Sequence, residues 1–528
     1  MSEAGDWVGD WSARRAALSP DAPALTDATT GETWTYADLD ARANRTARLL
    51  ADRGVADGER VAVVSRNRPA LVDLVFACGK TGGVFAPLSH RLAPPELAAL
   101  LGTVDPELVV VEERFEGDVA DALGDVEDGD DRPEVLALAT DGDHDAPAFG
   151  GAVPADDSPY RSRDRSPDDP FMFLHTGGST GTPKETVLTH GSVVWNATNT
   201  VTAWGLRPGD ATPMVFPMFH TGGWNVLTMP LFHVGGHVVI ARDFDPGEVL
   251  SLVEAHDASV LVAVPAVLRM VTEHDDWPDA DLSSLRFAKS GGGPCRRAVM
   301  EAWWDRGVDL SQGYGLTECG PNNFAMPDDW PREKADSVGV PAMHVDARVV
   351  AEDGTPVEDG EVGELLLRGP HAAAGYWRAP EETAETFDAA PVDDPTADGV
   401  SAGWVSTGDL ARRDADGYYY VEGRKKNMFV SGGENVYPPE VEDAVADHPK
   451  VEEVVVVGVP DDTWGTVGKA VVQGDESLTL AALEAFLDDR LAGFKHPRHL
   501  AFVDELPTSG PSKIDRDAVR EAFGAEDA

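Results

Sequence analysis

"FLHTGGSTGTPKETVLTH", residues 173–190, places a glycine-rich loop before a run of alternating polar and apolar residues. The nine positions from Thr176 to Lys184 hold four glycines or prolines, four Thr or Ser hydroxyls and one lysine. Glycine lets backbone N–H groups approach an anion closely, hydroxyls donate further hydrogen bonds, and lysine adds positive charge. The stretch therefore predicts a loop that binds phosphate.

This loop does not match that of a P-loop nucleotidase. A Walker A loop requires G-x-x-x-x-G-K-[ST], but neither Gly177 nor Gly178 has a glycine five residues later, and Pro183 precedes Lys184. The residues ETVLTH after the loop alternate like a strand, whereas a P-loop opens a helix. The pattern therefore excludes the P-loop class.

Size and charge narrow the possible partners. With 528 residues and 42% hydrophobic residues, the chain can form two or more domains and is not a disordered protein. Lys and Arg number 43 against 93 Asp and Glu, a net charge of −50 that would repel nucleic acid and anionic lipid. We therefore expect no nucleic-acid partner and no integral membrane association.

The acidic surplus is spread along the whole chain and is not confined to one tail. This distribution is typical of a halophilic cytosol, because molar salt shortens the Debye length to roughly 3 Å and screens self-repulsion. An acidic enzyme from a mesophile is the alternative.

The cysteines, the N-terminal segment and the uncharged run at 211–241 indicate the cellular compartment of the protein. Cys78, Cys295 and Cys319 form no CxxC pair, which argues against a disulfide framework or a zinc site. The start "MSEAGDWVGDWSARRAAL" has no apolar segment of the secretory type. Residues 211–241 lack charge but contain prolines and glycines, so we expect buried strands and loops there. A cytoplasmic location fits these features.

Hydrophobic periodicity predicts an α/β protein. Leu39, Ala43, Ala47 and Leu50 have helical spacing, and the apolar run at 61–64 after Asp57-Gly58 predicts a buried strand. Similar runs recur at 108–111, 238–240 and 260–264. Residues 113–169 are acidic and rich in proline and glycine, so we expect surface excursions there.

The last hundred residues predict a small α+β domain. A helix should close before Pro449, and a strand should follow at 454–457. Leu480, Leu483, Leu487 and Leu491 form one helical stripe. We place a domain boundary near Arg424 to Asn427.

The loop "TGGSTGTPKE" resembles that of the AMP-forming acyl-CoA synthetases, luciferases and peptide-synthetase adenylation domains. Further motifs that resemble this acyl-adenylate-forming family follow in the family's order, and the similarity runs from about Trp34 to Arg516. They are "PMFHTGGW" (217–224), "KSGGGP" (289–294), "GYGLTE" (313–318), "GELLLRGP" (363–370), "WVSTGDL" (404–410), "EGRKKNMFVSGGENVYPPEVE" (422–442) and the late Lys513.

The resemblance implies an α/β fold with a large N-terminal domain of several subdomains and a smaller, mobile α+β C-terminal domain. We expect the AMP-binding domain at residues 1–423, a hinge at 424–427 that contains Lys426, and the C-terminal domain at 428–528.

The resemblance also assigns the residues that bind ATP. The phosphate cradle would consist of Thr176, Gly177, Gly178, Ser179, Thr180, Gly181 and Lys184. Thr317 would lie at the α-phosphate, Gly291, Gly292, Gly293, Tyr314 and Gly315 at the adenine, and Asp409 with Arg424 at the ribose. Taken singly, Asp409 could be a helix cap or turn residue and Tyr314 a core residue.

A metal and the acid substrate complete the implied site. Glu318 would hold Mg2+, because a carboxylate beside a triphosphate is repelled unless a hard cation lies between them. Otherwise it is a surface acid. His220 would lie beside the substrate carboxylate, with a core histidine as the alternative reading, and Trp224 and Asn225 would border the acyl pocket.

The family's second half-reaction implies movement of the C-terminal domain. Lys513 would act in adenylation, and Gly432, Gly433 and Glu434 would then approach the adenylate for thioester formation. Three positions depart from the family pattern: Ser512 replaces the usual glycine, Thr508 a basic residue, and Asn427 an acidic residue beside the hinge.

These features predict an ATP-dependent ligase that joins a carboxylic acid to coenzyme A through an acyl-adenylate, releasing AMP and pyrophosphate. The apolar stretch "HTGGWNVLTMPLF" favours a medium- or long-chain fatty acid and hence lipid metabolism, and an aryl acid is the alternative. An adenylation enzyme that loads a carrier protein and a non-catalytic nucleotide-binding regulator are competing hypotheses. The oligomeric state, with a homodimer among the options, is left open.

The charge distribution yields a first prediction. Raising KCl should increase the melting temperature, most steeply between about 0.1 and about 1 M, where the Debye length falls from about 10 to about 3 Å. Thermal unfolding followed by circular dichroism at several salt concentrations measures this. A melting temperature that does not respond to KCl would contradict the expected self-repulsion.

Overall fold

The computed structural model describes residues 9–124, 132–138, 146–162, 164–176, 184–387, 403–431, 434–461, 464–488, 490–508 and 514–524. Seven sheets organise these residues. Within them, no helix combines the length and the hydropathy that a membrane span requires.

The largest sheet has six strands in the order β6-β5-β3-β4-β7-β8 and is parallel except for the antiparallel pair β7 and β8. Its strands are β3 (Arg60–Val64), β4 (Val84–Leu88), β5 (Leu108–Glu112), β6 (Glu134–Leu138), β7 (Pro170–Thr176) and β8 (Lys184–Thr189). The helices connected to these strands are α2 (Tyr36–Asp52), α3 (Pro69–Thr81), α4 (Pro94–Val104), α5 (Glu116–Leu123) and α7 (His190–Trp204).

Helix α2 shows how local sequence sets these elements. Thr35 and Asp38 form a capping box at its start, which satisfies backbone N–H groups that the helix leaves free. The predicted apolar stripe is fully buried, and Gly54 adopts a φ of +84° just after the helix ends. The predicted helix and the strand after it are confirmed.

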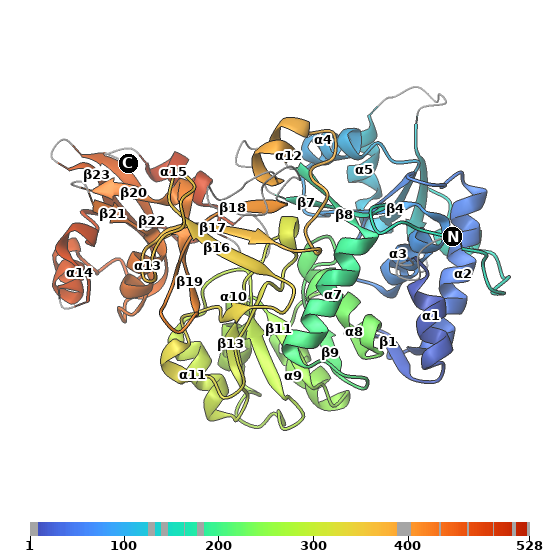
Figure 1. The fold of residues 1–528 in the computed structure, drawn as a ribbon, viewed down its shortest axis with the longest axis horizontal. Helices are drawn as coiled ribbons and strands as arrows, with labels where there is room; N and C mark the ends of the chain where they lie inside the picture. The colour runs from blue at the N-terminus through green and yellow to red at the C-terminus, as the bar shows by residue number, and fades with distance from the viewer. Residues whose placement is uncertain are drawn as a thin grey trace.

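Two further sheets belong to the N-terminal part of the chain (Figure 1). One has the order β2-β1-β10-β9 and comprises β1 (Pro23–Asp27), β2 (Thr33–Thr35), β9 (Ala211–Met214) and β10 (His237–Ile240). The other is parallel and comprises β11 (Val260–Ala263), β12 (Phe287–Ser290) and β13 (Leu310–Gln312). Their helices are α1 (Trp11–Leu18), α8 (Thr228–Val234), α9 (Pro246–Ala255), α10 (Pro265–Glu273) and α11 (Arg297–Asp305).

The uncharged run at 211–241 forms β9, a π-helical turn (Gly222–Val226), α8 and β10. The prediction of buried strands is confirmed, and the helical turns between them are an addition. The acidic segment at 113–169 is more regular than expected, because α5, β6 and a short helix α6 (Phe149–Ala152) lie within it. Val119, Leu136 and Phe149 are buried there, and these isolated apolar residues are too few to produce a visible period.

An antiparallel sheet of four strands lies between these parts and the C-terminal region in Figure 1. It comprises β16 (Asp346–Val350), β17 (Gly363–Arg368), β18 (Trp404–Arg413) and β19 (Tyr419–Arg424), with α12 (Pro380–Phe387) before β18. The short pair β14 (Phe324–Ala325) and β15 (Val340–Pro341) precedes it.

The C-terminal region has hydrophobic clusters of its own, made only of residues from Phe429 onward. Its elements are β20 (Phe429–Ser431), β21 (Glu434–Val436), α13 (Pro438–Ala446), β22 (Val451–Asp461), β23 (Gly465–Gly474), α14 (Leu480–Leu487), β24 (His499–Phe502) and α15 (Arg516–Phe523). The helix predicted before Pro449 and the strand predicted at 454–457 are confirmed as α13 and β22. Leu483 and Leu487 of α14 pack in this core, whereas Leu480 lines an open cavity. The predicted stripe is too long by one residue, because α14 ends at Leu487 and Leu491 packs against the core from beyond the helix.

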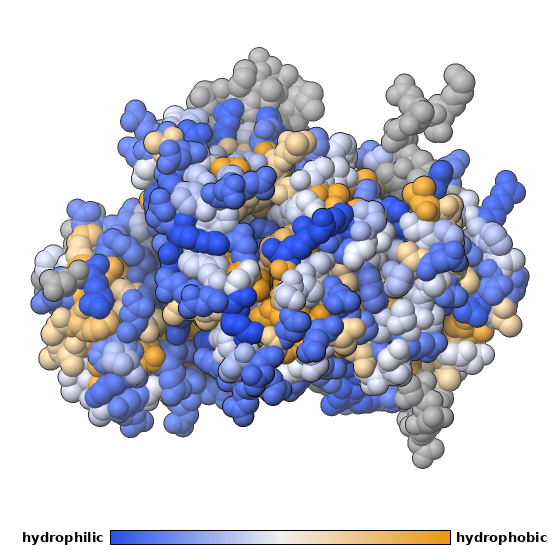
Figure 2. Space-filling view, turned by 90° about the horizontal axis from the view of Figure 1, so that it is seen from below, coloured by the Kyte–Doolittle hydropathy of each residue, from blue (hydrophilic) through white to orange (hydrophobic). Residues whose placement is uncertain are grey.

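Hydrophilic residues cover most of the face shown in Figure 2, and apolar residues gather in smaller patches. All three cysteines are buried and free.

Lys289 on β12 is a charged residue inside the parallel sheet. It is 7% exposed, and its Nζ donates to Ser311 Oγ at 3.0 Å. The same Nζ lies 5.1 Å from the ring centroid of Trp204. Burial lowers the pKa of Lys289 to about 8, although Asp309 opposes the shift. Lys289 has a higher pKa in the unfolded chain than in the folded protein. Burial of the charged lysine therefore lowers the free energy of unfolding most below pH 8, and this penalty falls as pH rises from 8 toward the unfolded pKa.

Lys289→Met should therefore stabilise the protein at pH 7 by about 1–3 kcal/mol, since each unit of pKa shift corresponds to about 1.4 kcal/mol. The difference in the free energy of unfolding between the variant and the natural protein should shrink between about pH 8 and about pH 10. Urea unfolding of both proteins across this pH range measures it. An advantage that is constant with pH would show that packing, and not charge burial, sets the difference.

Candidate active site

The glycine-rich loop connects β7 to β8, with Thr176 opposite Lys184 in the register of the pair. Both residues are partly exposed at the base of the loop. This antiparallel hairpin confirms the strand expected after the loop. Gly177, Gly178, Ser179, Thr180 and Gly181 lie outside the described residues.

Lys184 faces two residues that the sequence did not indicate. Its Nζ lies 5.2 Å from the ring centroid of Tyr376 and 3.9 Å from Glu382 Oε1. Its side chain is 20% exposed, so the ammonium lies near the surface at the start of β8.

Thr317 and Glu318 occupy a short 3₁₀ turn after β13. Gly315 approaches the chain of Pro321 so closely that a Cβ atom would lie 2.2 Å from its carbonyl carbon. Thr317 is buried, and Glu318 Oε1 accepts a hydrogen bond from Tyr376 Oη at 2.9 Å. No Lys or Arg of the described chain forms an ion pair with Glu318.

The donor set at Glu318 suits a magnesium ion that is held chiefly by a nucleotide. In the part of the chain that the structure describes, no three His, Cys, Asp or Glu side chains form a metal cage. Mg2+ commonly binds one or two protein carboxylates together with phosphate oxygens and water, so a single carboxylate without an ion-pair partner fits this mode.

The residues expected at adenine and ribose come from three segments. Gly291, Gly292 and Gly293 follow β12, and nothing lies within 4 Å of a Cβ built on Gly291 or Gly293. Tyr314 Oη donates to Asp409 Oδ2 at 2.5 Å, and Arg424 Nε lies 2.8 Å from Asp409 Oδ1. Burial, followed by the charge of Asp409, raises the pKa of Tyr314 well above its usual value, so the phenol stays a donor.

His220 is exposed and has a defined ring orientation. The N–H of Gly222 donates to His220 Nδ1 at 3.1 Å, which places the proton of the neutral ring on Nε2. Next to it, the ring of Phe219 lies 5.4 Å from that of His90 and 6.0 Å from that of His175. Burial lowers the pKa of both histidines to about 4, so both imidazole rings are uncharged at neutral pH.

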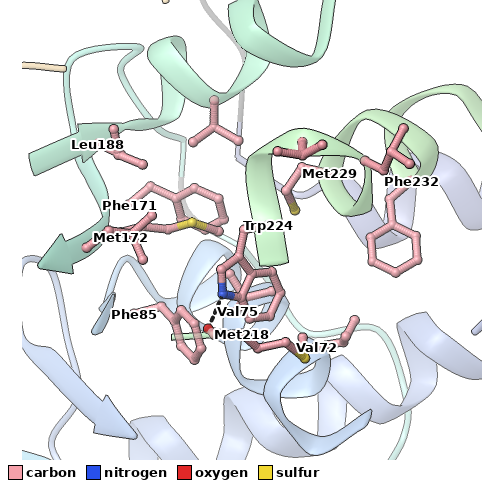
Figure 3. Packing of buried hydrophobic residues seen from close by; sticks show 14 of the residues in the cluster. Val72, Val75, Phe85, Phe171, Met172, Leu188, Met218, Trp224, Met229 and Phe232 are labelled. Atoms are coloured by element: carbon pink, nitrogen blue, oxygen red, sulfur yellow. Dashed lines mark hydrogen bonds between the residues drawn. The ribbon is translucent and has the colours of Figure 1, made fainter. Parts of the chain in front are cut away.

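Trp224 and Asn225 lie deeper than expected for exposed pocket walls. Trp224 is 0% exposed, packs 5.1 Å from the Phe85 ring and donates from Nε1 to the carbonyl of Met218 at 2.6 Å (Figure 3). Asn225 is 2% exposed, and its Nδ2 donates to Thr221 Oγ1. Both side chains therefore have packing roles in this structure, and their contact with an acid stays a prediction.

The expected hinge contacts the last helix. Lys426 Nζ lies 3.0 Å from Asp517 Oδ2, and Arg520 donates to Asn427 Oδ1 at 3.0 Å. Glu434 begins β21 and is exposed. Gly432, Gly433 and Lys513 lie outside the described ranges.

Sequence reasoning missed Tyr376, although it lies in "HAAAGYWRAPEET" (371–383), directly after a motif that was singled out. It also missed Arg91, whose guanidinium carbon lies 5.8 Å from the Phe219 ring centroid. Neither residue belongs to a quoted motif, and only three-dimensional proximity marks them.

Comparison with known proteins matches nearly the whole chain. The family described as "AMP-binding enzyme" matches residues 12–377, and "AMP-binding enzyme C-terminal domain" matches residues 440–513. Feruloyl-CoA synthase from Amycolatopsis sp is 38% identical over 98% of this chain and 99% of that protein. Indoleacetate–CoA ligase from Aromatoleum aromaticum is 35% identical (97% and 98%), and the long-chain-fatty-acid–CoA ligase FadD13 from Mycobacterium tuberculosis is 31% identical (98% and 99%).

A solved structure in two states adds information on conformation. ATP-bound MatB from Rhodopseudomonas palustris superimposes with a TM-score of 0.86, at 30% identity over 98% of this chain and 99% of that one. Apo MatB, with the same identity and coverage, gives 0.76. Both structures are of MatB, so the difference in TM-score reflects conformation and not sequence. The conformation of the present chain is therefore closer to the ATP-bound form than to the apo form. The chain belongs to the AMP-binding enzyme family and is an AMP-forming acid–CoA ligase that uses ATP and CoA as substrates.

Proposed function

We propose that the acid substrate is an aryl or arylalkanoic acid. The wall beside His220 supports this assignment, because Phe219, His90 and His175 offer flat, uncharged rings against which a planar aryl group can pack. Two relatives with 35% identity or more act, by their names, on ferulate and indoleacetate. The fatty acid favoured by the apolar sequence is the weaker candidate, since much of that apolar stretch is core, as Trp224 illustrates.

We assign the adenylation residues as follows. The loop at 176–181 and Lys184 hold the β- and γ-phosphates of ATP, Thr317 contacts the α-phosphate, and Glu318 holds Mg2+. Asp409 and Arg424 bind the ribose, while Tyr314, Gly315 and Gly291–Gly293 border the adenine. Bound Mg2+ would supply positive charge against the triphosphate. Nε2–H of His220 can donate to the substrate carboxylate and orient it.

The reaction has two balanced steps. A carboxylate oxygen attacks the α-phosphorus of ATP, the bond to the bridging oxygen breaks, and pyrophosphate leaves. The thiol sulfur of CoA then attacks the acyl carbon of the mixed anhydride, loses its proton, and AMP leaves. Because two anions meet in the first step, Lys184 and Lys513 contribute by positioning and by stabilising negative charge.

We further propose that residues 428–528 move as a unit about a hinge at 424–427, relative to an AMP-binding domain at 1–423. The separate hydrophobic clusters of the C-terminal region support this division, as does the better match to ATP-bound than to apo MatB. Lys513 would serve adenylation, and rotation at Lys426 would bring Gly432, Gly433 and Glu434 to the adenylate.

We place the phosphates of CoA at a cluster of four arginines, which are Arg66, Arg68, Arg91 and Arg242. The charges of Arg66 and Arg242 act on Arg68, and those of Arg66 and Arg91 act on His90, so these cations lie near one another. Carboxylates neutralise part of this charge, because Glu112 pairs with Arg66 and Arg68, and Asp243 pairs with Arg66. Such a concentration of cations in a chain of net charge −50 suits a polyanionic ligand beside Phe219.

The substrate proposal is tested by a panel of acids assayed for AMP release with CoA in molar KCl. Aryl and arylalkanoic acids such as ferulate and indoleacetate should give kcat/KM values at least about 10-fold above those of saturated fatty acids, the size expected from roughly 1.4 kcal/mol of pocket complementarity. Higher values for fatty acids would contradict it. Turnover only with a carrier protein as acceptor would instead favour an adenylation enzyme.

The arginine cluster makes a separate prediction. Arg91→Gln should raise the KM for CoA by about 5- to 10-fold, the effect of one charge-assisted contact of roughly 1 kcal/mol or more, and leave the KM for ATP unchanged. Arg378→Gln is the matched control, because Arg378 is an exposed arginine paired with Asp105. Equal changes in the KM values of both substrates would refute the assignment.

A further inference from the structure

Tyr376 lies on a segment that extends the phosphate-loop hairpin. The N–H of Val187 donates to the carbonyl of Gly375 at 2.9 Å, and the N–H of Trp377 donates to the carbonyl of Glu185 at 2.8 Å. Thr186 and Tyr376 form an antiparallel bridge. Residues 374–377 therefore run along β8, the strand that starts with Lys184, and place Tyr376 beside the base of the loop.

The side chain of Tyr376 contacts both charged groups of the proposed phosphate site. Its Oη donates to Glu318 Oε1 at 2.9 Å, and its ring centroid lies 5.2 Å from Lys184 Nζ. Lys184 and Glu318 themselves form no ion pair within 4.0 Å, and the nearest carboxylate oxygen paired with Lys184 belongs to Glu382. The tyrosine thus lies against the lysine with its ring and against the carboxylate with its hydroxyl.

The position of Tyr376 is tightly defined. Gly375 has a φ of +136°, and a Cβ there would lie 2.4 Å from Thr383 Cγ2. The N–H of Tyr376 donates to Thr383 Oγ1 at 2.9 Å, and its ring packs edge-on against Phe387 at 5.5 Å. Contacts with helix α12 therefore fix the tyrosine in addition to its contacts with β8.

The hydroxyl keeps its proton over the working pH range. A phenol has a pKa of about 10 in water, whereas an ionised carboxylate can only accept, so the 2.9 Å contact from Tyr376 Oη to Glu318 Oε1 has the hydroxyl as its donor. The phenol therefore acts as a lasting donor that can orient one oxygen of Glu318 and leave the other oxygen for a cation.

We propose that Tyr376 is a positioning residue for adenylation, which keeps Lys184 and Glu318 apart and orients each toward the triphosphate and its metal. This inference rests on the proposed roles of those two residues. Without the hydroxyl, Glu318 could turn toward the lysine, and the resulting ion pair would withdraw a cation from ATP and a ligand from Mg2+. Thioester formation from a finished adenylate involves no triphosphate, so it should not need Tyr376.

The test uses Tyr376→Phe in the full-length protein, which removes the hydroxyl and keeps the ring. Acid-dependent exchange of pyrophosphate into ATP should fall about 10-fold, the effect of losing one hydrogen bond to a charged group. The Mg2+ concentration for half-maximal exchange should rise about threefold or more. Conversion of a synthetic acyl-adenylate and CoA to thioester should stay within about twofold of the natural enzyme.

Two further variants make the result decisive. Tyr420→Phe removes a hydroxyl that donates to Asp414 at 3.0 Å, outside the site, and should leave both half-reactions unchanged. Glu318→Gln should lower exchange by itself, and adding Tyr376→Phe to it should produce little further loss.

The outcomes separate the two hypotheses. Normal exchange and normal Mg2+ dependence in Tyr376→Phe, with impaired exchange in Glu318→Gln, would overturn the role of the tyrosine alone. Equal losses in both half-reactions would also overturn it and indicate a structural role. Normal exchange in Glu318→Gln would instead overturn the metal assignment on which the inference rests.

Discussion

The reaction requires two anions to meet, and electrostatic repulsion between them is the constraint on which the site depends. The surrounding chain makes this harder, since it carries 93 acidic against 43 basic residues. The structure concentrates cations locally. Lys184 begins β8 at the base of the glycine-rich loop. Arg66, Arg68 and Arg91 lie near one another, with Arg91 beside the ring of Phe219. Carboxylates balance part of this charge, since Glu112 pairs with Arg66 and Arg68, and Asp243 pairs with Arg66.

The residues of the proposed nucleotide site come from separate sheets. The β7–β8 hairpin supplies Thr176 and Lys184, and the residues after the parallel strands β12 and β13 supply Gly291 and Tyr314. Ligands commonly bind at the carboxyl ends of parallel strands, where backbone N–H groups and loop side chains are exposed. The antiparallel pair β18 and β19 adds Asp409 and Arg424, which face each other in its register.

Much of this could be predicted from sequence, because glycine-rich loops and hydrophobic periods are local signals. The strand after the loop, helix α2 and β22 follow from motifs or periods that a single sequence displays, whereas Tyr314, Asp409 and Arg424 were assigned to one nucleotide only through the family resemblance. Tyr376 could not be found in this way, since its importance arises from contacts with Lys184 and Glu318, which lie far away in the chain. Trp224 was assigned to a pocket wall, but an apolar residue beside a site motif can equally belong to the core, and its complete burial is a property of packing.

We propose that an oxygen of the substrate carboxylate attacks the innermost phosphorus of ATP at this site. The most direct measurement uses an acid labelled with 18O in both carboxylate oxygens, turned over with ATP, Mg2+ and CoA, followed by mass spectrometry of the products. We expect one 18O atom in each AMP and none in pyrophosphate. Label in inorganic phosphate or pyrophosphate, or AMP without label, would contradict it.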